Sequence, residues 1–222
     1  MSGHAFAAGN AGEARCGLCR RVEMPFAKAS AYGSYEGGLR DLIQLLKYER
    51  VKPAASVLGR MLAEAIQDLE PSFEDGEVLV VPVPLHTGKF RERGFNQAEL
   101  IALAALKGWP AGGRLRLQGG VLERRRETSS QTGLTSHQRR ENIRGAFAVA
   151  KPQDANGRQF LVVDDVFTTG TTVSECARVL RRAGASKVFV ATVARTLKGE
   201  ASFATMRMDS KAGRRMAMAA NA

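Results

Sequence analysis

The chain has 222 residues, 44% of them hydrophobic, which suits one enzyme-sized domain with a buried core and short appendages. Its 33 basic and 22 acidic residues give a formal charge of +11, so we expect anionic partners such as phosphorylated metabolites or nucleic acid. No segment reaches the ~18 apolar residues of a membrane span and no signal-peptide pattern opens the chain, so membrane insertion is excluded and a cytoplasmic location is predicted.

The amino-terminal 30 residues are predicted to be flexible. Residues 1–15 are small and polar without a period. Cys16 and Cys19 then form a CxxC pair, which is half of a zinc ribbon. The other half is missing and Cys176 falls in a predicted helix, so a closed Zn²⁺ site within this chain is not expected. Reduced thiols and a metal shared between two chains are the remaining alternatives.

Two amphipathic helices are predicted next. Residues 31–38 are rich in turn formers and could hold a short strand. Apolar residues at helical spacing predict a helix over 39–47, and a second one follows Pro53, which favours a helix start, and ends before Pro71. Both apolar stripes are typical of ordinary core surface.

A buried strand is predicted over residues 77–86, and it runs into a basic loop at residues 87–97. A helix is predicted over 96–107. A cationic turn between a parallel strand and a helix start suits pyrophosphate, while a basic surface loop is the alternative. The candidate pyrophosphate-binding residues are Pro84, Lys89, Arg91 and Arg93.

Residues 121–141 are polar, rich in arginine and poor in packing groups. A loop of this length inside a compact domain is usually a lid or a disordered segment, and a solvated charged face is the alternative. Further strands are predicted over 145–150, 160–163 and 187–194. Strands that alternate with helices predict an α/β fold, a doubly wound and mostly parallel sheet.

The most informative segment begins at the strand of residues 160–163, which leads into Asp164 and Asp165. Ligands of open α/β sheets bind at the carboxyl ends of the strands, so we expect both acids to point into a crevice. Paired carboxylates suit the hydroxyls of a vicinal diol. A glycine turn and a helix over 173–183 follow, and a helix start favours a phosphate. The turn consists of Thr168, Thr169, Gly170, Thr171 and Thr172.

The plainer alternative is that the acids end a strand and a threonine caps the helix. Two other phosphate sites are excluded, because the chain contains neither G-x-x-x-x-G-K-[ST] nor G-x-G-x-x-G. The segment resembles the phosphoribosyl pyrophosphate (PRPP) motif of type I phosphoribosyltransferases.

The order of motifs across residues 16–195 resembles the ComF family of phosphoribosyltransferase-like competence proteins. The matching motifs are CGLC at 16–19, AYGSYEG at 31–37, LKY at 46–48, VPVPLH at 81–86, RGFNQA at 93–98, Arg126 with Thr128 and Gln131, RRENIRGAF at 139–147, and the acidic pair. The family usually carries a complete zinc ribbon and ends near Arg195, so this chain departs from it at both ends.

The resemblance implies that Asp164 and Asp165 bind ribose, that residues 168–172 bind the 5-phosphate, and that residues 83–93 lie near pyrophosphate. It also implies Mg²⁺ carried on the pyrophosphate oxygens. Catalysis would then rest on cations that stabilise the leaving group, and Arg139 or Arg140 with Arg93 are the candidates.

Three regions are therefore predicted: a flexible start with the CxxC remnant (1–30), a phosphoribosyltransferase-like domain (31–196) and a basic, disordered tail (197–222). The leading hypothesis is a phosphoribosyltransferase that binds PRPP or another sugar phosphate and acts in DNA uptake or nucleotide metabolism. The alternative is a non-catalytic competence factor that retains the PRPP pocket and binds single-stranded DNA through its arginine-rich loop and tail. A helicase-like ATPase is a candidate partner, and the sequence leaves the acceptor and the oligomeric state open.

Overall fold

The computed structural model describes residues 4–7, 24–110, 113–128 and 135–196. Cys16, Cys19 and the basic tail of residues 197–222 lie outside these ranges, so the predictions made for them stay predictions. In the described part of the chain, no helix has the length and apolar character needed to cross a membrane.

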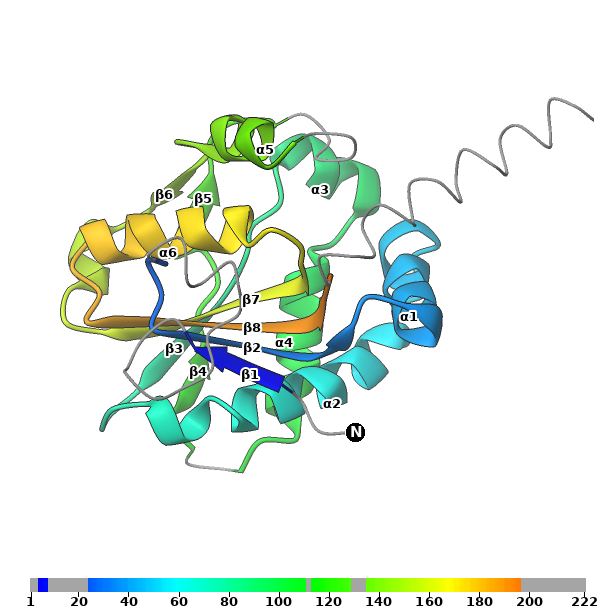
Figure 1. The fold of residues 1–222 in the computed structure, drawn as a ribbon, viewed down its shortest axis with the longest axis horizontal. Helices are drawn as coiled ribbons and strands as arrows, with labels where there is room; N and C mark the ends of the chain where they lie inside the picture. The colour runs from blue at the N-terminus through cyan, green and yellow to red at the C-terminus, as the bar shows by residue number, and fades with distance from the viewer. Residues whose placement is uncertain (1–3, 8–23, 111–112, 129–134, 197–222) are drawn as a thin grey trace, which may run out of the picture.

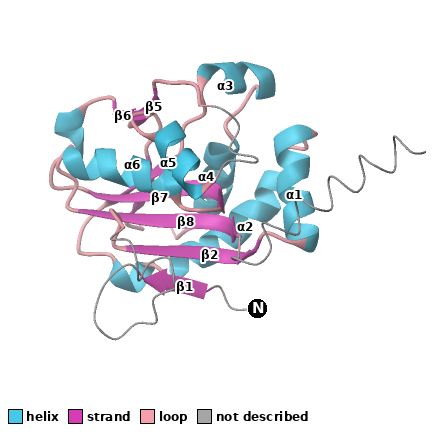
Figure 2. Ribbon diagram, turned by 45° about the horizontal axis from the view of Figure 1, so that its top comes forward, coloured by secondary structure: helices cyan, strands magenta, loops and turns pink. Residues whose placement is uncertain are grey.

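A six-stranded sheet in the order β1-β2-β8-β7-β3-β4 forms the centre of the molecule (Figure 2). β1 pairs antiparallel with β2, and every other pairing in this sheet is parallel. The strands are β1 His4–Ala7, β2 Lys28–Ser34, β3 Val78–Pro82, β4 Leu115–Leu117, β7 Gln159–Phe167 and β8 Lys187–Arg195. The predicted α/β fold with a mostly parallel sheet is thus confirmed.

Helices cover both faces of this sheet. α2 Ala54–Gln67 and α4 Gln97–Lys107 pack on one face, and α6 Thr171–Arg182 packs on the other. α2 and α4 approach closely, because a Cβ added at Gly59 would lie 2.5 Å from the Cβ of Ala104. α1 Gly37–Tyr48 packs against α2 and stands across the end of the sheet where β7 and β8 finish (Figure 1).

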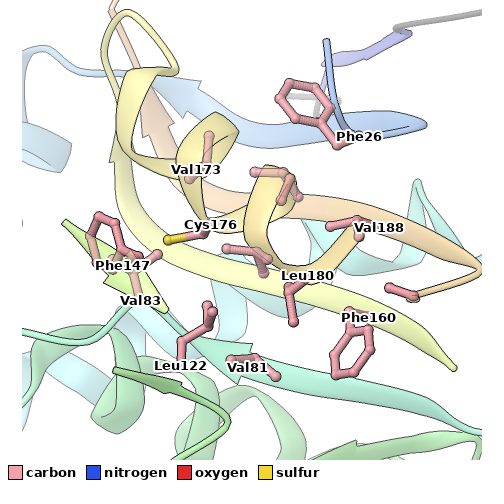
Figure 3. Packing of buried hydrophobic residues seen from close by; sticks show 14 of the residues in the cluster. Phe26, Val81, Val83, Leu122, Phe147, Phe160, Val173, Cys176, Leu180 and Val188 are labelled. Carbon is pink, nitrogen blue, oxygen red and sulfur yellow. The ribbon is translucent and has the colours of Figure 1, made fainter. Parts of the chain in front are cut away.

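The apolar layer beneath α6 is dense, as Figure 3 shows. Leu180 points from the helix toward Phe160 of β7, and Cys176 points toward Phe147 and Val83. Val173 belongs to the same layer, and Val173, Cys176, Leu180 and Phe160 are each at most 2% exposed. Burial of a large apolar side chain typically contributes ~1.5–3 kcal/mol. This layer therefore fixes the position of α6 relative to β7, the strand that carries the acidic pair.

A small second sheet and one helix form a cap above α6. β5 Leu122–Arg124 pairs antiparallel with β6 Phe147–Val149, and α5 Ser136–Ile143 lies between them in the sequence. The long-loop prediction for residues 121–141 was wrong in its described part, because β5 and α5 occupy it. The strand predicted at 145–150 exists as β6, but it belongs to the cap.

Two strands of the main sheet were not predicted from the sequence. β1 lies where a mobile segment was predicted, and β4 was not predicted at all. Each is only four or three residues long and lies at an edge of the sheet, so neither leaves a detectable alternation in the sequence. The short helices are α3 Thr87–Arg93 and the 3₁₀ turns η1 Glu70–Ser72 and η2 Pro152–Ala155.

Candidate functional site

The acidic pair lies inside β7, because the strand continues to Phe167. The prediction that the strand ends before Asp164 was therefore wrong. In each aspartate, Oδ1 accepts a hydrogen bond from the next backbone N–H, at 2.9 Å from Asp165 N and 2.9 Å from Val166 N. Both carboxylates are thus oriented by the strand, and Oδ2 of each is the remaining acceptor.

The two carboxylates face different surroundings, since successive side chains of a strand point to opposite faces. Asp164 is half-buried on the α6 side, where its charge acts on Arg124 of β5 and Cys176 of α6. Asp165 is only 4% exposed and its Oδ2 forms an ion pair with Nζ of Lys47, from α1. Both acids were expected to point into a crevice, whereas Asp165 is buried against a lysine.

Burial and the charge of Asp165 raise the pKa of Asp164 to about 8, and Lys47 acts in the opposite direction. Burial by itself lowers the pKa of Lys47, but the ion pair and hydrogen bond with Asp165, together with Asp164 and Tyr35, outweigh this effect, and the pKa lies above its usual value. Lys47 therefore remains charged at neutral pH. Asp164 is the group of this cluster whose protonation changes near neutral pH, which is a common property of functional sites.

The predicted glycine turn follows β7 directly, and α6 begins at Thr171. Gly170 has φ +73°, and a Cβ there would lie 2.5 Å from the ring of Phe167, so only glycine fits. Oγ1 of Thr169 and Oγ1 of Thr171 are 2.7 Å apart and form a hydrogen bond. Hydroxyls and the first N–H groups of a helix thus lie next to the acidic pair, an arrangement that suits an anion.

The segment after β3 differs from its prediction. Residues 87–93 form the helix α3 instead of a loop, and Nδ1 of His86 accepts from Gly88 N at its start. Nζ of Lys89 lies 2.7 Å from Oε2 of Glu92, and Arg91 is exposed. Arg93 donates a hydrogen bond to Gln97, and its Cζ lies 6.0 Å from the ring centre of Tyr48. Among these cations, Lys89 and Arg93 therefore already have protein partners.

Asn96 links the exit of β3 to the start of α4. Its Nδ2 donates to Val83 O at 3.0 Å, and its Oδ1 accepts from Ala98 N at 3.0 Å. This buried amide fixes the backbone just before Pro84, at the edge where the acidic pair lies.

The arginine-rich segment is partly structural. Arg126 donates to Asn142 O at 2.8 Å and Arg144 O at 3.0 Å, so it caps the end of α5. Arg124 hydrogen-bonds Thr128, and burial lowers its pKa against the opposing charge of Asp164. Its Nε is buried without a hydrogen-bond partner in the described structure, which leaves a donor near Asp164.

Arg139 and Arg140 lie on α5 in the cap, but their side chains fall outside the description. Their predicted contact with a leaving group stays a prediction.

Neither Lys47 nor Arg124 was predicted from the sequence to belong to the site. Lys47 occupies the last turn of an amphipathic helix, where a lysine is ordinarily explained by the helix dipole. The one available signal was its position in the LKY motif at residues 46–48.

Comparisons with known proteins agree on one family. A family model described as "Phosphoribosyl transferase domain" matches residues 114–204. "DNA utilization protein YhgH" of Escherichia coli (strain K12) is 34% identical over 185 residues, which covers 82% of this chain and 78% of that protein. "Competence protein F" of Haemophilus influenzae is 31% identical over 182 residues, with 81% and 78% covered.

One solved structure that matches is the glutamine PRPP amidotransferase from B. subtilis in complex with ADP and GMP. It is 21% identical with a TM-score of 0.40, and the match covers 67% of this chain and 30% of that one.

Proposed function

The chain belongs to the ComF family of phosphoribosyltransferase-like proteins, and from this premise we propose that it binds PRPP with Mg²⁺ at the carboxyl edge of β7. We further propose that it transfers the phosphoribosyl group in the service of DNA uptake or utilization. The observation that carries the proposal is that Asp164, the Gly170 turn and the start of α6 follow one another directly in the chain. A carboxylate that can accept from sugar hydroxyls is therefore followed at once by N–H groups that can donate to a phosphate.

In this proposal the protein's own groups bind and orient the ligand. The backbone N–H groups at the start of α6 and the hydroxyls of Thr169 and Thr171 hold the 5-phosphate, and Asp164 accepts from a ribose hydroxyl. Arg124, whose buried Nε has no partner in the described structure, is a donor on the same side as Asp164. Positioning and charge stabilisation then supply most of the rate, because loss of pyrophosphate needs little proton transfer.

The acidic side chains near the proposed site suit a Mg²⁺ ion that is carried by the ligand. Asp165 is already neutralised by Lys47, and the described residues include no group of three or more His, Cys, Asp or Glu side chains placed to hold a metal ion. Mg²⁺ readily binds through substrate phosphates and water. When bound, it would neutralise charge that develops on pyrophosphate.

A thermal-shift titration tests binding. We expect PRPP with Mg²⁺ to raise the Tm. At a ligand concentration 100-fold above Kd, binding should stabilise the folded state by about 2.7 kcal/mol. The shift should shrink without Mg²⁺ and disappear in Asp164→Asn. Asp154→Asn, at an exposed acid of η2, is the matched control and should keep the full shift. No shift with the wild type at millimolar PRPP would contradict the proposal.

Turnover needs a separate assay, because the described residues do not define the acceptor. Pyrophosphate release would be measured with PRPP, Mg²⁺ and a panel of bases, amines and oligonucleotides. Release that depends on one acceptor class supports transfer, while binding without any release would limit the protein to sensing PRPP.

The nucleic-acid alternative loses part of its basis. It rested on the net charge, the arginine-rich loop of residues 121–141 and the basic tail. Within that loop, Arg124 and Arg126 donate to Thr128, Asn142 and Arg144 in the cap. The basic tail lies outside the described residues.

A further inference from the structure

Lys47 brings a third charge to the acidic pair from a distant part of the sequence. It lies at the end of α1, more than a hundred residues before Asp165, and outside the matched residues 114–204 of the phosphoribosyl transferase model. Its ammonium group pairs with Asp165 while the side chain is 18% exposed and the Asp165 side chain is 5% exposed. The pair is thus largely buried where α1 faces the ends of β7 and β8 (Figure 1).

An unpaired carboxylate at the place of Asp165 would be costly, because transfer of an isolated charge out of water is strongly unfavourable. It would also repel the neighbouring carboxylate of Asp164. Lys47 neutralises Asp165 and partly offsets its repulsion of Asp164. The Oδ1 atoms are occupied by backbone N–H groups and Oδ2 of Asp165 by Lys47, so Oδ2 of Asp164 is the acceptor that remains for a ligand.

We propose that Lys47 is a positioning residue of the sugar-phosphate site: its ion pair with Asp165 favours the ionised form of Asp164, the form that accepts a hydrogen bond from a ligand hydroxyl. This inference rests on the proposed function and deepens it, since it divides the acidic motif into one carboxylate that meets the ligand and one that is held by α1.

The proposal predicts how binding responds to pH. The charged groups around Asp164 are Asp165 on β7, Lys47 on α1 and Arg124 on β5, and the Cys176 thiol of α6 also faces it. Tyr35 lies near Lys47. A hydroxyl donor prefers the ionised carboxylate, so affinity should rise with pH as Asp164 loses its proton. Without the Lys47 charge, that rise should move to higher pH.

The test uses Lys47→Met, Lys47→Arg and, as a matched control, Lys52→Met, at an exposed lysine of the segment after α1. PRPP affinity with Mg²⁺ would be measured from pH 6 to pH 9 for each. We expect Lys47→Met to weaken binding about tenfold or more at pH 7, which corresponds to 1.4 kcal/mol, and to recover toward pH 9. Lys47→Arg should keep most of the wild-type profile, and Lys52→Met should match the wild type.

Equal losses in Lys47→Met and Lys47→Arg at every pH, or an unshifted profile in Lys47→Met, would overturn the proposal. If Lys47→Met does not fold, the double variant Lys47→Met with Asp165→Asn removes both charges and should restore folding and binding.

Carboxyl-carbon NMR of the ligand-free protein separates this proposal from the proposed function. The titration of Asp164 should move to higher pH in Lys47→Met and stay in place in Lys52→Met. An unmoved titration rejects the Lys47 assignment even where PRPP binds. Failure of the wild type to bind PRPP rejects the proposed function, and with it the positioning role, even where the titration moves.

Discussion

Glu175 of α6 accepts a hydrogen bond from the backbone N–H of Gly145 at 2.7 Å, and so joins the helix behind the glycine turn to the cap. The same carboxylate accepts from Nε of Arg178 at 2.7 Å, although it is only 9% exposed. Gly145 lies between α5 and β6, so this contact positions the cap over the site.

Removal of this contact should loosen the cap. Glu175→Ala leaves the Gly145 N–H without its acceptor, and we expect a loss of ~1–3 kcal/mol in the free energy of unfolding. Glu175→Gln keeps an amide oxygen and should lose less. Urea unfolding measures both, and equal stability of Glu175→Ala and wild type would show that the cap does not depend on this bond.

Gly170→Ala should damage the anion turn. A positive φ costs an alanine ~1–2 kcal/mol, and here the added methyl group also meets the Phe167 ring. Gly157→Ala is the matched control, because Gly157 has φ +70° and open space around its Cβ. Both variants should lower the Tm, but Gly170→Ala alone should lose the PRPP-dependent shift. An equal PRPP shift in the two variants would argue against the turn as the phosphate site.

Asn96 should matter for stability through two bonds. Asn96→Ala loses the cap of α4, worth ~0.5–2 kcal/mol, and the donor to Val83 O as well. Asn96→Asp keeps the capping oxygen but places a carboxylate against a carbonyl, so it should also destabilise the protein. Guanidinium unfolding of the two variants measures this, and a neutral Asn96→Asp would show that the bond to Val83 contributes little.

Asp164 should make the ligand-free protein less stable as pH rises. Its pKa is about 8 in the folded state against a usual value of 3.8, so between these values the folded state holds a proton that the unfolded state has released. Stability contributed by this proton is present at low pH and is lost as pH rises toward 8. Asp164→Asn should therefore be more stable than the wild type at pH 8, with a smaller advantage at pH 5, in a Tm series. Asp154→Asn should show no such trend, and a constant Asp164→Asn difference would contradict the assignment.

Cys176 should be chemically inert in the folded protein. Its side chain is fully buried beneath α6, and burial raises the pKa of the thiol well above its usual value. In a variant with Cys16→Ser and Cys19→Ser, a thiol reagent should react with the protein only after denaturant is added. Rapid reaction of the native variant would show that the α6 layer opens readily.

Several features were predictable from sequence because their causes are local. Periodicity identified α1, α2 and α6, and a continuous apolar run identified β3, β7 and β8. The acidic pair and its glycine turn were visible for the same reason, since strand, acids, turn and helix are contiguous. The glycine of the predicted turn, Gly170, has φ +73° and no room for a Cβ.

Only the tertiary structure decided how those residues are used. Short edge strands such as β4 have too little pattern to be seen, and the pairing of β5 with β6 depends on contacts between distant segments. Lys47 and Asp165 meet because α1 folds across the end of β7, and Asp164 differs from Asp165 because a strand turns neighbouring side chains to opposite faces. The sequence thus determined the motif and the family, whereas long-range packing decided which carboxylate is buried, which cation holds it and which is left for a ligand.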